Sequence, residues 1–153
     1  MVGRIDKRLA ELRITLPDPP TPKGNYSPYV QTGNLVFLAG QLPGDDVMFI
    51  GRVGDTRSAE QAQIGARQCA LNLLAQLRKA CSGDLDRVVR CVKVTGWVQA
   101  IPEFTGHPAV VNGASDLFVE VFGEAGKHAR AAVGAPSLPR GALVEVEAVF
   151  EIR

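Results

Sequence analysis

The stretch "ALVEVEAVFEI", residues 142–152, decides the fold class. Apolar side chains recur at every second position, which is the period of a strand with one buried face. The even positions, from Ala142 to Ile152, are predicted to face a core. The odd positions are predicted to face the other way, and they are Leu143, Glu145, Glu147, Val149 and Glu151.

Two longer segments upstream have helical spacing. In residues 58–84, Ser58 and Gln61 form a predicted capping box and Gly83 ends the helix. Its expected apolar face consists of Ile64, Leu71, Leu74 and Leu77. Residues 107–126 carry an apolar stripe at helical spacing, which we interpret as core packing against a sheet.

The remaining elements are strands and an N-terminal helix. Residues 29–32 and 35–41 predict a hairpin around Gly33 and Asn34, and a short strand is expected at 47–50. Residues 85–101 predict a long strand and 128–134 a shorter one. Both main helices are therefore expected on one face of a mixed sheet, in an α+β domain.

The segment before this domain is of a different kind. Residues 4–14 predict a short amphipathic helix, and four prolines between Pro17 and Pro22 form an extended connector. We assign residues 1–23 to this helix and connector, and residues 24–153 to a single domain.

Composition excludes several classes of function. A net charge of +1 and the lack of a basic run argue against nucleic acid as a partner. No stretch approaches the roughly 18–20 apolar residues that cross a bilayer, and no signal peptide is visible, so a cytoplasmic protein without a membrane partner is expected. No metal-ligand cluster or cofactor motif is present, so neither metal nor cofactor is expected. Cys69, Cys81 and Cys91 are interpreted as reduced packing thiols, with Cys81 the most exposed.

Arg130 is the residue that needs an explanation. It stands among small apolar residues in the predicted strand 128–134, where a guanidinium is costly unless an anion meets it. The anion is either Glu147, in a structural ion pair between strands, or a carboxylate belonging to a ligand. His128 lies two residues earlier, on the same predicted strand face, although most histidines at a strand start are plain surface residues.

Two segments resemble the Rid family of reactive-intermediate deaminases, also called the YjgF family. "GNYSPYVQTGNLVFLAGQLP", residues 24–43, is similar to the family's opening hairpin. "HARAAVGAPSLPRGALVEVEAVFEI", residues 128–152, is similar to its closing signature, P-A-R-S-x-V followed by E-I-E-A. The likeness spans about residues 24–153 and resembles a branch with an N-terminal extension.

The resemblance implies a fold and an assembly. The fold is chorismate-mutase-like, with two helices on one face of a mixed six-stranded sheet. The assembly is a homotrimer with three sites in the clefts between subunits. The last strand agrees with such an assembly, since Leu143 and Val149 on its mixed face would be exposed in a monomer.

The resemblance also implies an activity, the hydrolysis of enamines and imines such as 2-aminoacrylate to 2-keto acids and ammonia. In the family pattern, Arg130 binds the substrate carboxylate and Glu147 positions or activates the attacking water. The other implied contacts are the side chain of Tyr26, the backbone carbonyl of Gly40, the backbone N–H of Ala132 and a pocket asparagine, Asn112.

Two departures and two alternatives accompany this reading. Ala39 and Ala131 replace serines of the family pattern. A non-catalytic protein that binds a small-molecule carboxylate through Arg130 is the first alternative. An endoribonuclease, as in the family's L-PSP-like names, is the second, and the lack of a His–His pair and of a basic stripe argues against it.

Overall fold

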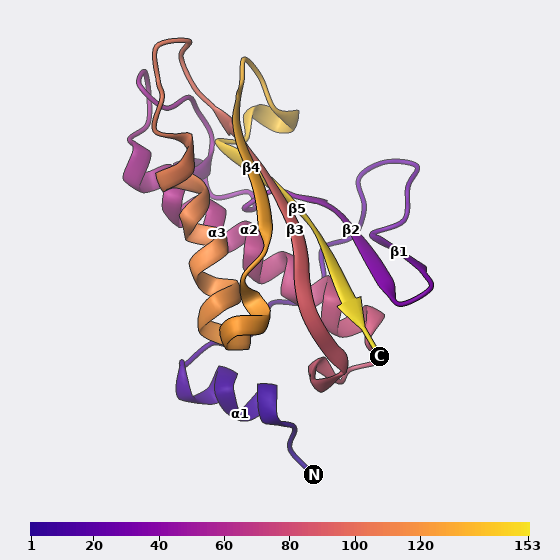
Figure 1. The fold of residues 1–153 in the computed structure, drawn as a ribbon. Helices are drawn as coiled ribbons and strands as arrows, with labels where there is room; N and C mark the ends of the chain where they lie inside the picture. Colours follow the sequence, from indigo (N-terminus) through magenta and orange to yellow (C-terminus); the bar gives the residue numbers. More distant parts are fainter.

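A computed structural model describes residues 1–153 as a sheet with helices on one side (Figure 1). Its strands are β1 (Tyr29–Thr32), β2 (Leu35–Gln41), β3 (Val88–Gln99), β4 (Ala129–Ala135) and β5 (Val144–Ile152). Their spatial order is β1-β2-β5-β3-β4, so the last strand of the chain lies at the centre of the sheet. Three pairs are antiparallel and β3–β4 is parallel, which makes the sheet mixed.

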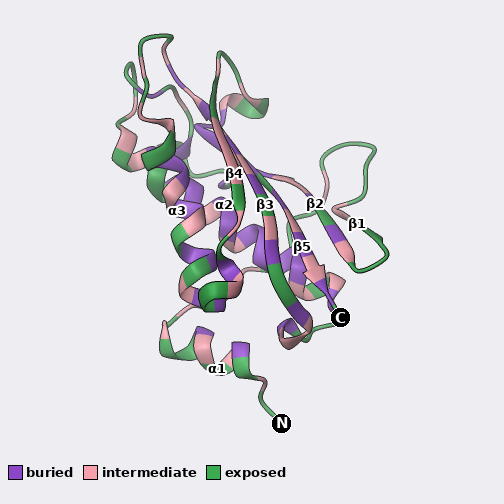
Figure 2. Cartoon of the chain, in the orientation of Figure 1, coloured by how far each residue is buried: buried purple, intermediate pink, exposed green.

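The main helices are α2 (Ala59–Ala80) and α3 (His107–Phe122), and both cover the same face of the sheet (Figures 1 and 2). The α+β class and the two helices on one face are therefore as predicted. Helix α3 connects β3 to β4, which is the crossover that a parallel pair requires.

The predicted sixth strand is wrong, because the sheet has five strands. Residues Val47–Phe49, expected as part of a strand, form a 3₁₀ helix instead. The Asp46 carboxylate accepts a hydrogen bond from the Met48 N–H at 3.0 Å, which closes the turn locally. Ile50 retains a single isolated bridge to Ala142.

The ends of α2 follow the sequence prediction. The Ser58 side chain accepts from the Gln61 N–H, and the Gln61 side chain accepts from the Ser58 N–H, which completes the capping box. At the other end, Gly83 has a φ of +93°, and its N–H donates to the Arg78 carbonyl at 2.8 Å.

Three burial predictions are wrong. Ile64 is 53% exposed. The residues of α2 that face the core are mainly small residues and leucines, and Ile64 does not share their side of the helix. Leu143 is fully buried, because its backbone is hydrogen-bonded between Phe49 and Gln99 before the alternation of β5 begins. Cys81 is also fully buried beneath the end of α2. From Val144 to Ile152 the predicted alternation is confirmed.

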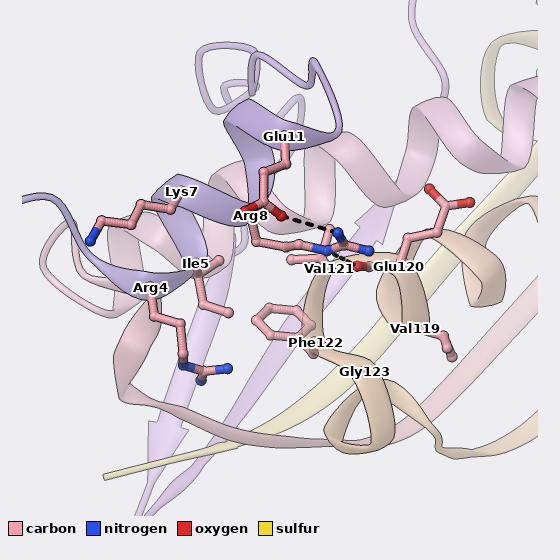
Figure 3. Close-up of a pocket in the computed structure, with 10 residues that line it drawn as sticks. All are labelled: Arg4, Ile5, Lys7, Arg8, Glu11, Val119, Glu120, Val121, Phe122 and Gly123. Carbon is pink, nitrogen blue, oxygen red and sulfur yellow. Dashed lines mark hydrogen bonds and ion pairs between the residues drawn. The ribbon is translucent and has the colours of Figure 1, made fainter.

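Helix α1 (Arg4–Glu11) packs on the same core as the rest of the chain, through Ile5 and Leu9. Its first turn is capped from a distance, since the Asp86 carboxylate accepts from the N–H groups of Arg4 at 2.7 Å and Ile5 at 2.8 Å. Arg8 Nε donates to the Glu120 carbonyl at 2.8 Å and joins α1 to α3 (Figure 3). None of the helices combines the length and the hydropathy needed to cross a membrane.

Candidate functional site

Arg130 lies on β4 at one edge of the sheet, and its side chain reaches α3. Its Nη1 donates to Asn112 Oδ1 at 2.7 Å and to Ser115 Oγ at 3.2 Å, and its Nη2 donates to the Pro108 carbonyl at 3.2 Å. Two residues that the sequence predicts for the site, Arg130 and Asn112, are therefore in direct contact. Ala132, two positions further along β4, lies on the same face and packs against the core.

The guanidinium keeps unused hydrogen-bonding capacity. Its three partners take both N–H groups of Nη1 and one of Nη2, and they leave free the N–H of Nε and one N–H of Nη2. Neighbouring N–H groups of this kind form the two-pronged contact that suits a carboxylate. All three partners are neutral, so the positive charge of Arg130 has no counterion within the chain.

Glu147 is not the partner of Arg130, so the structural ion pair considered from the sequence is wrong. Arg130 is opposite Val94 on β3, and Val94 is opposite Ala148 on β5, so these three side chains face the helices. Glu147 is the neighbour of Ala148 and points to the other face, where it is exposed. Strand β3 also separates β4 from β5.

The remaining predicted residues lie toward the opposite edge of the sheet. Tyr26 and Gly40 line a cavity of about 670 Å³ beside β2, together with Glu145 and the connector residues 20–23. A methyl group on Gly40 would collide with the Glu145 carboxylate, so glycine leaves this carboxylate its place in the cavity wall. Within one chain, the predicted site residues thus form two groups at the two sides of the sheet.

Three buried amides also line this cavity, and the sequence analysis missed them. Gln41, Asn72 and Gln76 donate to the carbonyls of Ala39 at 3.2 Å, Leu42 at 2.9 Å and Pro20 at 2.7 Å. Because each partner is a carbonyl oxygen, the amide nitrogen must face it, and the amide oxygen is left as an acceptor. The sequence gives little indication that these amides line a cavity, because all three lie in segments already predicted as a strand or a helix.

Glu145 is the more buried of the two neighbouring carboxylates on the outer face. Burial raises its pKa, and the charge of Glu147 on the same face raises it further. Neither carboxylate forms a hydrogen bond or ion pair with another residue of the chain. This face therefore presents a pair of acidic side chains with free oxygens, one half-buried and one exposed.

Ser115 is a second residue that the sequence analysis missed. It lies three residues after Asn112, on the same side of α3, and it contacts both Arg130 and His128. The sequence could have indicated Ser115, because a residue three positions after Asn112 lies on the same side of a helix. His128 and Arg130 lie on the same face, as predicted.

The three cysteines are buried and unpaired. Burial raises the pKa of each thiol, and that of Cys91 to about 12, so none is a thiolate at neutral pH. No group of three or more His, Cys, Asp or Glu side chains is arranged to hold a metal ion. A second cavity of about 600 Å³ lies between α1 and α3, and none of the predicted site residues lines it (Figure 3).

Comparison with known proteins identifies a family and similar folds. The family described as "YjgF/chorismate mutase-like, putative endoribonuclease" matches residues 6–152. Protein TCP17 of Trypanosoma cruzi is 45% identical over 98% of this chain and 95% of its own length. The crystal structure of Atu1372 from Agrobacterium tumefaciens, of unknown function, is 44% identical, with a TM-score of 0.88 over 97% of this chain and 92% of that one.

A third relative carries an activity in its name. The 2-iminobutanoate/2-iminopropanoate deaminase of Dermatophagoides farinae is 29% identical over 91% of this chain and 94% of its own length. The family match begins at residue 6, so it includes most of α1 as well as the sheet and the two main helices. The chain is a member of the YjgF/chorismate mutase-like family, as its two terminal signatures predict.

Proposed function

We propose that the protein hydrolyses 2-imino acids and their enamine tautomers, such as 2-aminoacrylate, to 2-keto acids and ammonia. The observation that carries the proposal is the state of Arg130. Its guanidinium is held by three neutral acceptors, has no counterion, and keeps unused N–H groups at Nε and Nη2, the two nitrogens of one edge. A ligand carboxylate supplies both the missing charge and the missing acceptors.

The proposed reaction is a hydrolysis without oxidation or reduction. A water molecule adds its oxygen to the imine carbon, and Glu147 accepts the proton that the water loses. The C–N bond then breaks, the nitrogen takes up protons and leaves as ammonia, and the carbon keeps its new oxygen as a ketone. The negative charge of the substrate stays on its carboxylate, against Arg130, throughout.

We propose that the site is completed between copies of the chain in a homotrimer. Arg130 and Asn112 lie beside one edge of the sheet, and Glu147, Gly40 and Tyr26 lie on its outer face or toward the other edge. In the trimer, Glu147, Gly40 and Tyr26 of a neighbouring copy would lie beside Arg130 and Asn112. Supporting this arrangement, Val30, Phe37 and Val149 form an apolar row across the uncovered face, with Val30 56% and Phe37 46% exposed.

The test of Arg130 is an assay in which an amino-acid oxidase generates imino acids in situ. We expect Arg130→Ala and Arg130→Lys to lose most of the hydrolysis rate while remaining folded. Lysine keeps the charge but not the two-pronged geometry, and loss of such a hydrogen bond costs roughly 1.5–3 kcal/mol of substrate interaction. Full activity in Arg130→Lys would contradict the proposal.

A non-catalytic carboxylate-binding protein is the second candidate. It is favoured by the separation of Arg130 from Glu147 on opposite faces of one sheet, since binding at Arg130 does not need Glu147. Glu147→Gln separates the two functions. If Glu147 activates water, turnover falls by about 10²–10⁴ while pyruvate still binds in calorimetry. Wild-type protein that binds pyruvate but does not accelerate imine hydrolysis would establish the second candidate.

A further inference from the structure

His128 forms a hydrogen bond at each of its ring nitrogens. Nδ1 lies 2.6 Å from the Gly126 carbonyl oxygen, and Nε2 lies 2.8 Å from Ser115 Oγ. A carbonyl oxygen can only accept, so Nδ1 carries the proton in the neutral ring. Nε2 is then an acceptor, and the Ser115 hydroxyl donates to it.

This arrangement fixes the direction of the Ser115 hydroxyl. With its hydrogen on His128, the Ser115 oxygen turns its lone pairs toward Arg130, whose Nη1 donates to it at 3.2 Å. The chain of contacts therefore runs from Gly126 through His128 and Ser115 to the guanidinium. In this chain of contacts Nδ1 of His128 donates and its Nε2 accepts, while the Ser115 hydroxyl donates to His128 and accepts from Arg130.

The surroundings favour the neutral form of His128. The ring is half-buried, with its plane at 82° to that of Phe118 and a centroid separation of 6.0 Å. Burial lowers the pKa of His128 most, the hydrogen bond to Gly126 acts in the opposite direction, and the charge of Arg130 lowers it again.

The other charged groups on the neighbouring elements lie at the surface. Lys93 on β3 and Asp116 on α3 are exposed. Glu124 and Lys127, in the segment before His128, are paired with each other at 2.8 Å. Arg130 is therefore the charged group that acts most directly on this ring.

We propose that His128 and Ser115 are positioning residues, which hold the Arg130 guanidinium so that its free Nε and Nη2 edge faces an incoming carboxylate. Asn112 and the Pro108 carbonyl hold the other side of the same group. This inference rests on the carboxylate-binding role proposed for Arg130.

The design of the test uses conservative and disruptive variants of each member. Ser115→Thr keeps the hydroxyl and Ser115→Ala removes it. His128→Gln keeps an acceptor near the position of Nε2, and His128→Leu removes it. His107→Gln is the matched control, because His107 packs on Phe104 and forms no hydrogen bond with Arg130.

The first measurement is binding of pyruvate by calorimetry, together with kcat and KM for 2-iminopropanoate. We expect Ser115→Ala and His128→Leu to raise Kd and KM about tenfold, the effect of losing one hydrogen bond to a charged group. We expect kcat to change little, because the carboxylate contact is the same before and during the reaction. Ser115→Thr, His128→Gln and the His107 control should bind as the wild type does.

The second measurement needs no ligand. Nitrogen NMR should show neutral His128 protonated at Nδ1, and should show separate Nη signals for Arg130, because a held guanidinium rotates slowly. Ser115→Ala and His128→Leu should merge the Nη signals of Arg130. Merged signals in the wild type, or unchanged signals and affinity in both disruptive variants, would overturn the inference. Wild-type protein with separate signals that binds no carboxylate would overturn the proposed function and leave the positioning intact.

Discussion

At the scale of single residues, the two acidic side chains of β5 differ more than their spacing suggests. Glu145 and Glu147 share a face, but Glu145 lies in the wall of the cavity beside Gly40, whereas Glu147 is exposed. The Glu145 carboxylate has no donor within the chain. Its ionisation in the native state is therefore opposed by burial and by the charge of Glu147.

Glu145→Gln should make the native state more stable at neutral pH. Because the pKa of Glu145 is raised in the folded chain, its stabilising effect is complete below the unfolded value and is lost as pH rises through the folded value. The amide removes this loss, so we expect Tm to rise by about 1–2 °C at pH 7 for this half-exposed group. Thermal unfolding at pH 7 and pH 4 measures it.

The gain from Glu145→Gln should disappear near pH 4, where the carboxyl of the wild type is protonated. Glu103→Gln, at an exposed loop position, is the control and should leave Tm unchanged at both pH values. A lower Tm for Glu145→Gln at pH 7 would show that the carboxylate has a stabilising partner after all.

Sequence reasoning placed Arg130 and Asn112 in one candidate site, because the family pattern carries both residues, and the structure brings the two side chains into contact. It could not place Glu147. Whether Glu147 shares a face with Arg130 depends on the register of β4 on β3 and of β3 on β5, and register is a property of pairing that no single strand displays. The spacing from Asn112 puts Ser115 on the same side of α3, but its contact with the guanidinium follows from the packing of α3 against β4, which the sequence does not display.

At the scale of elements, α2 and α3 approach closely at Gly113. A methyl group there would collide with the Gln63 carbonyl oxygen and lie 3.1 Å from the backbone nitrogen of Arg67. Both obstacles are backbone atoms of α2, so they cannot move aside as a side chain would. Near this close approach the buried residues of α2 are small ones such as Ala62 and Ala66, while the larger Ile64 lies exposed.

Gly113→Ala should therefore destabilise the protein, although alanine is the better helix former. Overpacking against a rigid backbone costs typically 1–3 kcal/mol, which urea unfolding would report as a lower midpoint with an unchanged slope. Asp116→Ala on the exposed side of the same helix is the control and should be neutral. Equal stability of the two variants would mean that the helices separate at little cost.

Helix α1 depends on one carboxylate from another part of the chain. Asp86→Ala should free the N–H groups of Arg4 and Ile5 and cost about 0.5–2 kcal/mol, as for other lost caps. Hydrogen exchange should then become faster in α1 while β3 and β5 keep their protection. Glu11→Ala, which removes only an exposed ion pair with Arg8, should change exchange much less.

The docking of α1 should also weaken in acid. The two backbone hydrogen bonds lower the pKa of Asp86, so their contribution is complete above the unfolded value of about 3.8 and is lost as pH falls through the folded value. Exchange in α1 that does not depend on pH below 4, after correction for intrinsic rates, would contradict this account.

At the scale of the whole molecule, the class and the layers were predictable and the number of strands was not. Periodicity distinguishes a helix from a strand within a dozen residues, which is why a helix within residues 58–84 and a strand within residues 142–152 were predicted correctly. Residues 47–50 are too short for periodicity, and the side-chain cap of Asp46 decided their structure.

We expect the protein to sediment at three times its chain mass of 16.3 kDa at micromolar concentration. The uncovered face of the sheet carries the apolar row of Val30, Phe37 and Val149, which burial between copies would stabilise. Phe37→Asp should reduce the mass and the imine hydrolysis rate together, because it charges the middle of that row. A wild-type mass equal to one chain would contradict the trimer.

The central position of β5 has a consequence for how the chain is made. Strand β5, which joins β2 to β3, is synthesised after the other four strands, so the two halves of the sheet have no common partner until β5 emerges from the ribosome. Until then, α2 and α3 lack part of the surface they pack on, and the nascent chain exposes apolar segments that chaperones recognise. A ribosome that stalls before β5 is complete would release a product that cannot close its core, so quality control should remove such truncated copies with little delay.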